Sequence, residues 1–115
     1  MTSASACKVL VIEDEGMVAM LLEEMLADLG HQVVATVGKI ETAKKWIGEG
    51  DFDFAVLDVN LNGTHTYPLA DMLKGRGIPF LFATGYGTGG LRPEWSDAPV
   101  LQKPFQLRQL QESIG

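Results

Sequence analysis

Cysteine and long apolar runs are both scarce in this sequence, and each scarcity excludes a class of protein. Cys7 is the one cysteine among 115 residues, so the chain can form neither an internal disulfide nor a cysteine zinc site. A reducing compartment, the cytoplasm, is therefore expected. No apolar run is long enough to cross a bilayer, and the first residues lack the apolar stretch of a secretory signal. We therefore expect no contact with a membrane.

Basic residues are also few. The chain has nine Lys and Arg against fifteen Asp and Glu, for a net charge of −6, and the basic residues are scattered along it. A surface that follows nucleic-acid phosphates needs a basic cluster, so we expect no direct nucleic-acid binding. The length fits one compact domain, and the 46% of hydrophobic residues suffices for a core.

What the sequence does contain is a regular alternation of two patterns. Short β-branched or apolar runs predict strands at 8–12, 32–37, 53–57, 78–83 and 99–102. Helical spacing predicts helices at 16–30, 39–48, 67–74, 91–96 and 105–114. Pro93 and the preceding glycines make the fourth helix short or mobile. Strict alternation favours an α/β fold with a parallel sheet between two helical layers, flavodoxin-like (βα)5 with strand order 2-1-3-4-5.

The first helix carries a stripe of Leu, Met and Val residues at helical spacing, which predicts a face buried in the core. Its members are Met17, Val18, Leu21, Leu22, Met25, Leu26 and Leu29.

Chemistry-bearing residues follow the ends of four expected strands. The first strand runs into Glu13 and Asp14, the third into Asp58, the fourth into Thr84 and the fifth into Lys103. In the expected strand order these ends lie side by side, where parallel sheets place their ligand sites. Converging carboxylates need a cation, and hard oxygen ligands suit Mg²⁺ or Mn²⁺. A lysine and a hydroxyl would hold phosphoryl oxygens, so the set predicts an acyl-phosphate site with Asp58 as acceptor.

Each of these residues also has a plainer interpretation. Acids after a strand favour a helix N-terminus, and an aspartate that ends a strand is commonly a cap or turn residue. Thr84 before a glycine fits a turn, and Lys103 before a proline fits an exposed surface. The site is favoured because all four coincidences would have to occur together.

The motifs together resemble a known family. Val9 to Glu15, Ala55 to Asp58, Thr84 after the fourth strand, and Lys103-Pro-Phe are similar to a response-regulator receiver domain. The run 79–87 also resembles the signature of the atypical bacterial receivers nicknamed "FAT GUY". The resemblance implies a tail at 1–7 and a stand-alone receiver domain at 8–115.

The resemblance also implies roles for single residues. Asp58 would be phosphorylated, Asp14 would bind Mg²⁺ directly and Glu13 mainly through water, and the carbonyl of Asn60 would be a further metal ligand. Thr84 would be the switch hydroxyl and Lys103 would contact the phosphoryl group. The phosphodonor would be a phosphohistidine on a sensor kinase or phosphotransfer protein, and the subfamily suggests an HWE-type kinase.

The sequence departs from the family pattern at the usual aromatic switch. Receivers typically carry Phe or Tyr three residues before the lysine of the fifth strand, and here that residue is Val100. Tyr86 lies two residues after Thr84 with a glycine on each side, so we hypothesise that it switches or shields the phosphoryl group. The alternative is a tyrosine packed on the loop for stability. The glycine-rich segment 87–96 is expected to be locally mobile.

Two other functions remain open on the sequence. A phosphohydrolase using an aspartyl-phosphate would need a second aspartate two residues after the nucleophile, and Asn60 stands there. A phosphate-independent interaction module on the same scaffold would not need the intact set of acids, threonine and lysine. The chain could also be a receiver cut from a longer protein.

Overall fold

The computed structural model describes residues 7–61, 63–84, 93–95, 98–102 and 107–114. Its strands are β1 (Lys8–Ile12), β2 (Gln32–Val37), β3 (Phe54–Asp58), β4 (Asn60–Leu61), β5 (Thr64–His65), β6 (Phe80–Thr84) and β7 (Val100–Gln102). Its helices are α1 (Gly16–Asp28), α2 (Ile40–Glu49), α3 (Tyr67–Gly75) and α4 (Leu107–Ile114), with a 3₁₀ turn η2 (Pro93–Trp95). Five parallel strands form the main sheet in the order β2-β1-β3-β6-β7. This order is the predicted 2-1-3-4-5, so the flavodoxin-like fold is confirmed.

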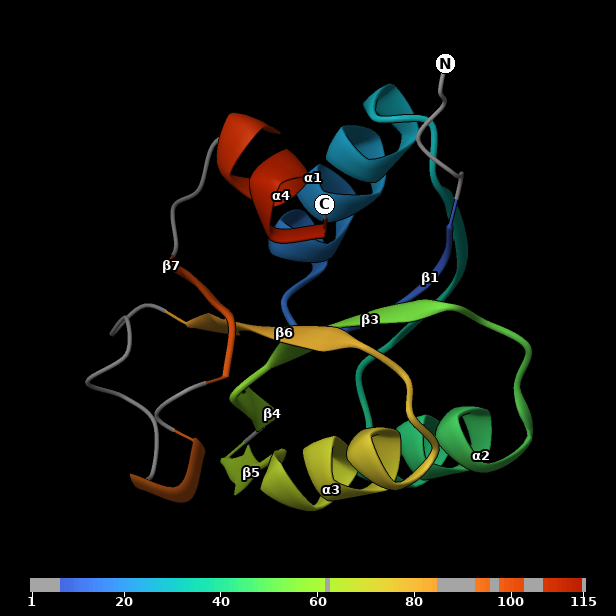
Figure 1. Cartoon of the computed structure of the whole chain (residues 1–115), viewed down its shortest axis with the longest axis vertical. Coiled ribbons are helices and arrows are strands. Elements are labelled where there is room, and N and C mark those ends of the chain that lie inside the picture. The colour runs from blue at the N-terminus through green and yellow to red at the C-terminus, as the bar shows by residue number, and fades with distance from the viewer. Residues whose placement is uncertain (1–6, 62, 85–92, 96–97, 103–106, 115) are drawn as a thin grey trace.

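The sheet is covered on both faces (Figure 1). Helices α1 and α4 lie on one side and α2 and α3 on the other. Side chains of β1 alternate between the two layers: Val9 and Val11 pack with α1 and α4, whereas Leu10 and Ile12 pack with α2 and α3. This period of two, with both faces buried, explains why the strands are continuous apolar runs. It also fixes the register, because a slip of one residue would exchange the two cores.

Two elements differ from the sequence prediction. The segment after Asp58, for which no strand was predicted, forms a small antiparallel hairpin of β4 and β5 with Asn60 opposite His65. Gly63 supplies a positive φ of +88° within it. The predicted fourth helix is described only at 93–95, where the chain makes one 3₁₀ turn. The rest of the expected mobile segment lies outside the described residues.

The predicted core stripe of α1 is partly wrong. Met17 and Leu21 are 84% and 41% exposed, and Met20 beside them is 63% exposed. The buried face of the helix is instead centred on Ala19, Leu22 and Leu26, an i, i+3, i+7 set. The apolar stripe is therefore wider than the sheet can cover, and its first turns present methionine and leucine to solvent.

None of the helices within the described ranges has the length and apolarity that crossing a membrane requires.

Candidate functional site

Three carboxylates meet where β1 and β3 end. Ile12 pairs with Leu57 across the two strands, so Glu13, Asp14 and Asp58 follow at the same edge of the sheet. One carboxylate oxygen from each lies within 4.8 Å of the others. Glu13 is buried, Asp58 is half-buried and Asp14 is exposed, so solvent reaches the cluster on the side of Asp14.

Backbone contacts fix the two acids that follow β1, Glu13 and Asp14. The amide of Glu13 extends the β1–β2 ladder by donating to the carbonyl of Val37, and its carboxylate Oε2 accepts from the amide of Glu15 at 3.1 Å. Gly38 lets the end of β2 approach closely: a Cβ there would lie 3.3 Å from the Cα of Asp14. Sequence reasoning missed Gly38, whose only signal was a glycine directly after an apolar strand.

Asp58 is joined to the hairpin that follows it. The amide of Asn60 donates to Asp58 Oδ1 at 3.3 Å, and Asn60 Oδ1 accepts from the amide of Gly63 at 2.7 Å. The hydroxyl of Thr66 donates to the backbone carbonyl of Asp58 at 2.5 Å. The Asn60 side chain is therefore used to close the turn, while its backbone lies beside the Asp58 carboxylate.

Thr84 ends the neighbouring strand. Ala83 pairs with Asp58, so Thr84 lies one residue beyond it along β6, where it is buried. Lys103, which follows β7, and Tyr86 both lie outside the described residues. The structure thus brings together Glu13, Asp14 and Asp58, with Thr84 at the adjoining strand end.

The chemistry of this donor set is that of a hard cation. All three side chains offer carboxylate oxygens, and at least one is open to water, which is what Mg²⁺ prefers. Carboxylates this close repel one another, and a divalent ion would offset that repulsion. The residues present therefore fit a magnesium ion.

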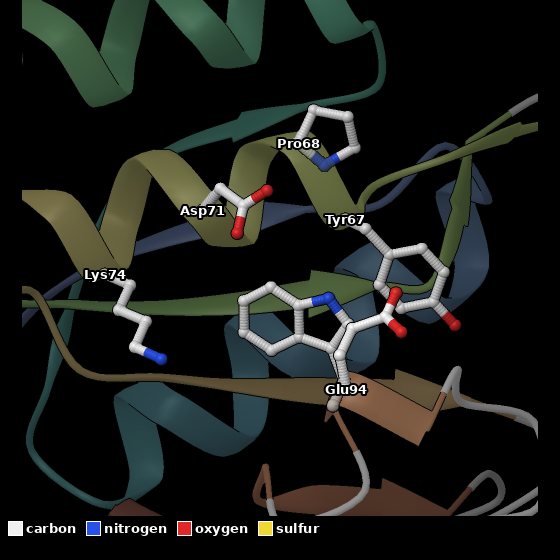
Figure 2. Close-up of a pocket in the computed structure, with 6 residues that line it drawn as sticks. Tyr67, Pro68, Asp71, Lys74 and Glu94 are labelled. Carbon is white, nitrogen blue, oxygen red and sulfur yellow. The ribbon is translucent and has the colours of Figure 1, made fainter.

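An aromatic cluster lies beside the hairpin on the α3 side of the sheet. The ring of Tyr67 is stacked on Trp95 at 6.3 Å, meets Phe82 edge-on at 5.8 Å and lies 5.6 Å from His65. Tyr67 and Trp95 also line a pocket of about 260 Å³ with Pro68, Asp71, Lys74 and Glu94 (Figure 2). Sequence reasoning missed this cluster. A signal that could have indicated part of it is the spacing of Phe80 and Phe82 on one face of a strand, but nothing in the sequence connects them with Trp95.

Comparison with known proteins decides the family. The model of the response regulator receiver domain matches residues 9–115. The chain belongs to the receiver domain family. Receiver domains of this family are phosphoacceptor modules of two-component signalling rather than catalytic enzymes, they bind Mg²⁺, and they work with histidine kinases.

Several solved and curated relatives support this assignment. SdrG from Sphingomonas melonis Fr1 is 37% identical with a TM-score of 0.87, covering 97% of this chain and 96% of SdrG. A BeF3-activated conformation of SdrG, from Pseudomonas melonis Fr1, is 39% identical with a TM-score of 0.82 and 96% coverage of both chains. The phyllosphere-induced regulator PhyR of Methylorubrum extorquens is 34% identical over 107 residues, which are 88% of this chain and 39% of PhyR. The receiver is therefore close to the SdrG and PhyR type.

Proposed function

We propose that Asp58 accepts a phosphoryl group from a phosphohistidine of a sensor kinase, in a reaction that needs Mg²⁺, and that the phosphorylated domain signals by protein–protein contact. The observation that carries the proposal is the convergence of Glu13, Asp14 and Asp58 within 4.8 Å at the end of the sheet. The BeF3-activated conformation of SdrG supports it, because BeF3⁻ is a tetrahedral analogue of a phosphoryl group and SdrG is 39% identical to this chain.

The transfer step needs one nucleophile and one leaving group. A carboxylate oxygen of Asp58 attacks phosphorus, the bond between phosphorus and the imidazole nitrogen of the donor breaks, and its electron pair stays on that nitrogen. The products are an acyl phosphate on Asp58 and, when the other ring nitrogen of the donor carries a proton, a neutral histidine on the kinase. Half-burial of Asp58 leaves the carboxylate reachable while the Asn60 amide orients one of its oxygens.

The other site residues take roles around that step. Asp14 would hold Mg²⁺ directly, Glu13 mainly through water, and the Asn60 carbonyl would be a further ligand beside Asp58. When bound, the ion neutralises the charge of the carboxylates and the incoming phosphoryl group. The hydroxyl of Thr84 would donate to one phosphoryl oxygen and Lys103 would form an ion pair with another.

A docking surface for the kinase is proposed at the start of α1. Met17, Met20 and Leu21 are exposed in the two turns that follow the acidic residues, and they line a groove with Val18 and Glu24. An exposed apolar groove on a helix fits the apolar face of a partner helix, and its place next to the acceptor would bring the phosphohistidine to Asp58. Met20→Glu should therefore slow transfer from the kinase and leave phosphorylation by acetyl phosphate unchanged. Equal slowing with both donors would contradict this assignment.

Two finer assignments belong to the same proposal. The resemblance of the run 79–87 to the "FAT GUY" signature supports membership of that subfamily, and an HWE-type kinase would then be the donor. Tyr86 would take part in switching or shield the phosphoryl group from water, because Val100 stands where receivers usually carry an aromatic residue. A Tyr86→Ala variant in which neither the dephosphorylation rate nor the spectral response to phosphorylation changes would remove that role. An HWE-type kinase that fails to phosphorylate the domain would remove the donor assignment.

The deciding experiment is intact-mass analysis after incubation with Mg²⁺ and acetyl phosphate. Wild type should gain one phosphoryl group and Asp58→Ala none. Asp53→Ala is the matched control, because Asp53 directly precedes β3, at the opposite end of the strand from Asp58. This variant should be phosphorylated like wild type. No adduct on folded wild type with either acetyl phosphate or kinase would overturn the proposal in favour of a phosphate-independent interaction module.

A further inference from the structure

We propose that Thr66 is a positioning residue of the receiver site. It holds the peptide units that lie between Asp58, the proposed phosphoacceptor, and the carbonyl of Asn60, the proposed further metal ligand. The inference rests on the proposed function of Asp58. Thr66 lies between β5 and α3, does not belong to the acidic cluster, and is one of the few polar residues that the fold buries completely, at 0% exposure.

The hydroxyl of Thr66 makes an unusual choice of partner. A threonine directly before a helix ordinarily accepts a hydrogen bond from an amide of the first turn. Thr66 precedes α3 but makes no such side-chain cap. Its Oγ1 instead donates to the carbonyl of Asp58, eight residues earlier in the chain. The side chain therefore serves the end of β3 rather than the start of α3.

The carbonyl that Thr66 contacts lies just beyond the last residue pair of β1 and β3. The amide of Val59 points to the carbonyl of Ala83 in β6, and a trans peptide places the Asp58 carbonyl on the opposite side, toward β1. The β1–β3 ladder ends one residue earlier, at Ile12 and Leu57. Thr66 thus supplies a hydrogen bond to this carbonyl from outside the sheet.

Thr66 also holds the next peptide unit. Its amide donates to the carbonyl of Val59 at 2.9 Å, so one residue binds two consecutive carbonyls after the acceptor side chain. This bond makes Asn60 and His65 a non-hydrogen-bonded pair, whose backbone groups point out of the hairpin. The Asn60 amide accordingly donates to Asp58 Oδ1. In an extended residue the carbonyl points to the same side as the amide, so the Asn60 carbonyl also faces Asp58. The two Thr66 contacts therefore aim the Asn60 carbonyl at the acceptor.

The test compares Thr66→Val, which keeps the shape and removes the hydroxyl, with Thr66→Ser, which keeps the hydroxyl. Mg²⁺ affinity is measured by titration of the free domain, and the rate by intact mass with acetyl phosphate at Mg²⁺ below saturation. Loss of a residue that orients a metal ligand costs on the order of tenfold in affinity. We expect about that loss of Mg²⁺ affinity in Thr66→Val, a matching fall in rate, and recovery in Thr66→Ser. Ile47→Val, a destabilising change in the core under α2, should leave both quantities at the wild-type value.

The outcomes separate this inference from the proposed function. Folded Thr66→Val with wild-type Mg²⁺ affinity and rate would overturn the role of Thr66, while phosphorylation of wild type and not Asp58→Ala would still support Asp58 as acceptor. Equal losses in Thr66→Val and Thr66→Ser would also overturn it, because packing would then be the cause. Wild type that takes up neither Mg²⁺ nor phosphate would remove both.

A measurement on wild type covers the case in which Thr66→Val does not fold. If the Thr66 contacts position the site, then filling the site must stabilise those contacts by the same coupling. Mg²⁺ with BeF3⁻ should therefore slow hydrogen exchange of the Thr66 amide. An unchanged exchange rate at saturation would overturn the inference.

Discussion

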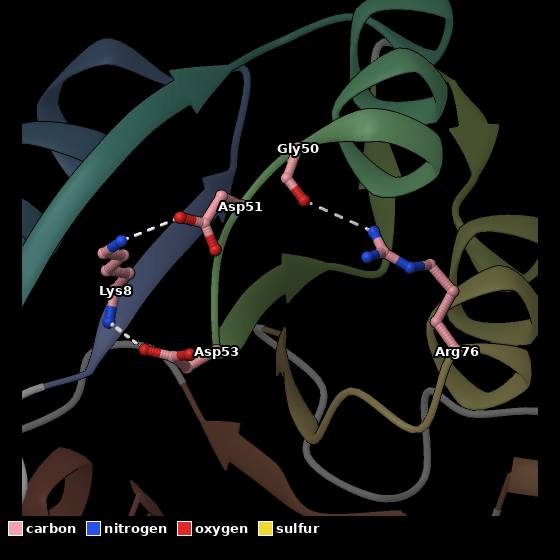
Figure 3. Close-up of polar contacts among 5 residues, drawn as sticks. All are labelled: Lys8, Gly50, Asp51, Asp53 and Arg76. Carbon is pink, nitrogen blue, oxygen red and sulfur yellow. Dashed lines mark hydrogen bonds and ion pairs between the residues drawn. The ribbon is translucent and has the colours of Figure 1, made fainter.

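The two ends of β1 treat charge in opposite ways. At the amino end, Lys8 Nζ forms an ion pair with Asp51 at 2.8 Å and the Lys8 amide donates to Asp53 at 2.9 Å. Nearby, at the end of α2, the guanidinium of Arg76 donates to the carbonyl of Gly50 (Figure 3). It also donates to the carbonyl of Ile47. At the carboxyl end, Glu13 and Asp14 converge on a third carboxylate, that of Asp58.

The difference separates residues that serve the fold from residues that serve the site. Opposite charges and donor–acceptor pairs at the amino end satisfy one another and need nothing further from outside. Three carboxylates within 4.8 Å repel, so their convergence works against the folded state and toward a cation. Substitutions at the amino end of β1 should therefore change the free energy of unfolding, and substitutions at the carboxyl end should change ligand binding. Three predictions test this division.

The largest expected effect is at the carboxyl end. At a Mg²⁺ concentration one hundred times its dissociation constant, wild type should gain about 2.7 kcal/mol in free energy of unfolding, since the ion binds the folded state. Asp14→Ala should lose most of this gain. Denaturant unfolding with and without Mg²⁺ measures it. Asp51→Asn, at the amino end of β1, should keep the whole gain. A wild-type gain in Asp14→Ala would contradict this division between the two ends.

A smaller effect is expected for Arg76 at the amino end. Arg76→Ala leaves the carbonyls of Ile47 and Gly50 without their guanidinium donor, which should lower the free energy of unfolding by about 1.5 kcal/mol. Mg²⁺ affinity and the phosphorylation rate should not change. Arg108→Ala, on the exposed side of α4, is the matched control and should leave stability at the wild-type value. A loss of Mg²⁺ affinity in Arg76→Ala would show that the two ends are coupled.

The smallest effect is expected for the exposed pair of Lys8 and Asp51, and it is best seen through pH. The hydrogen bond to Asp51 raises the pKa of Lys8 above its ordinary 10.5, so its stabilisation is present below that pH and is lost as pH rises through the raised value. The hydrogen bond to Lys8 lowers the pKa of Asp51 below its ordinary 3.8, so its stabilisation is present above that pH and is lost as pH falls through the lowered value.

Stability curves of wild type and Lys8→Met should therefore run parallel from about pH 5 to about pH 9 and converge outside that range. High salt should bring them together at every pH, because the pair is exposed. Curves that diverge between those limits would contradict the assignment.

The sheet was predictable from the sequence because both of its faces are buried. Strand 8–12 was predicted with the bounds that the structure gives, since an apolar run on a strand buried on both faces has little ambiguity. Strand 32–37, which lies at the edge of the sheet and is only partly buried, was also predicted with its observed bounds. The convergence of Glu13, Asp14 and Asp58 followed from strand order alone. Thr84 was likewise placed at the adjoining strand end by the same topology.

What could not be predicted depends on contacts between distant residues. The stripe of α1 gave Met17 the same weight as Leu22, because spacing along a helix cannot say how far the sheet extends beneath it. The β4–β5 hairpin was missed because its strands have two residues each, too short for any period to be detected. Thr66 carried no signal, since the hydroxyl acts on a carbonyl eight residues away.

The contacts of Thr66 close the segment 58–66 on itself, and this bears on how the segment could be transferred between receivers. Its two ends are tied to each other through the contacts of Thr66 with Asp58 and Val59, and its interior makes its own hairpin. We therefore expect that it can be exchanged between receivers as one piece, with the rest of the sheet left as it is. Grafting it would transfer Asp58, the Asn60 backbone and Thr66 together, so that this part of the site is inherited as a unit, while Glu13, Asp14 and Thr84 would come from the host receiver.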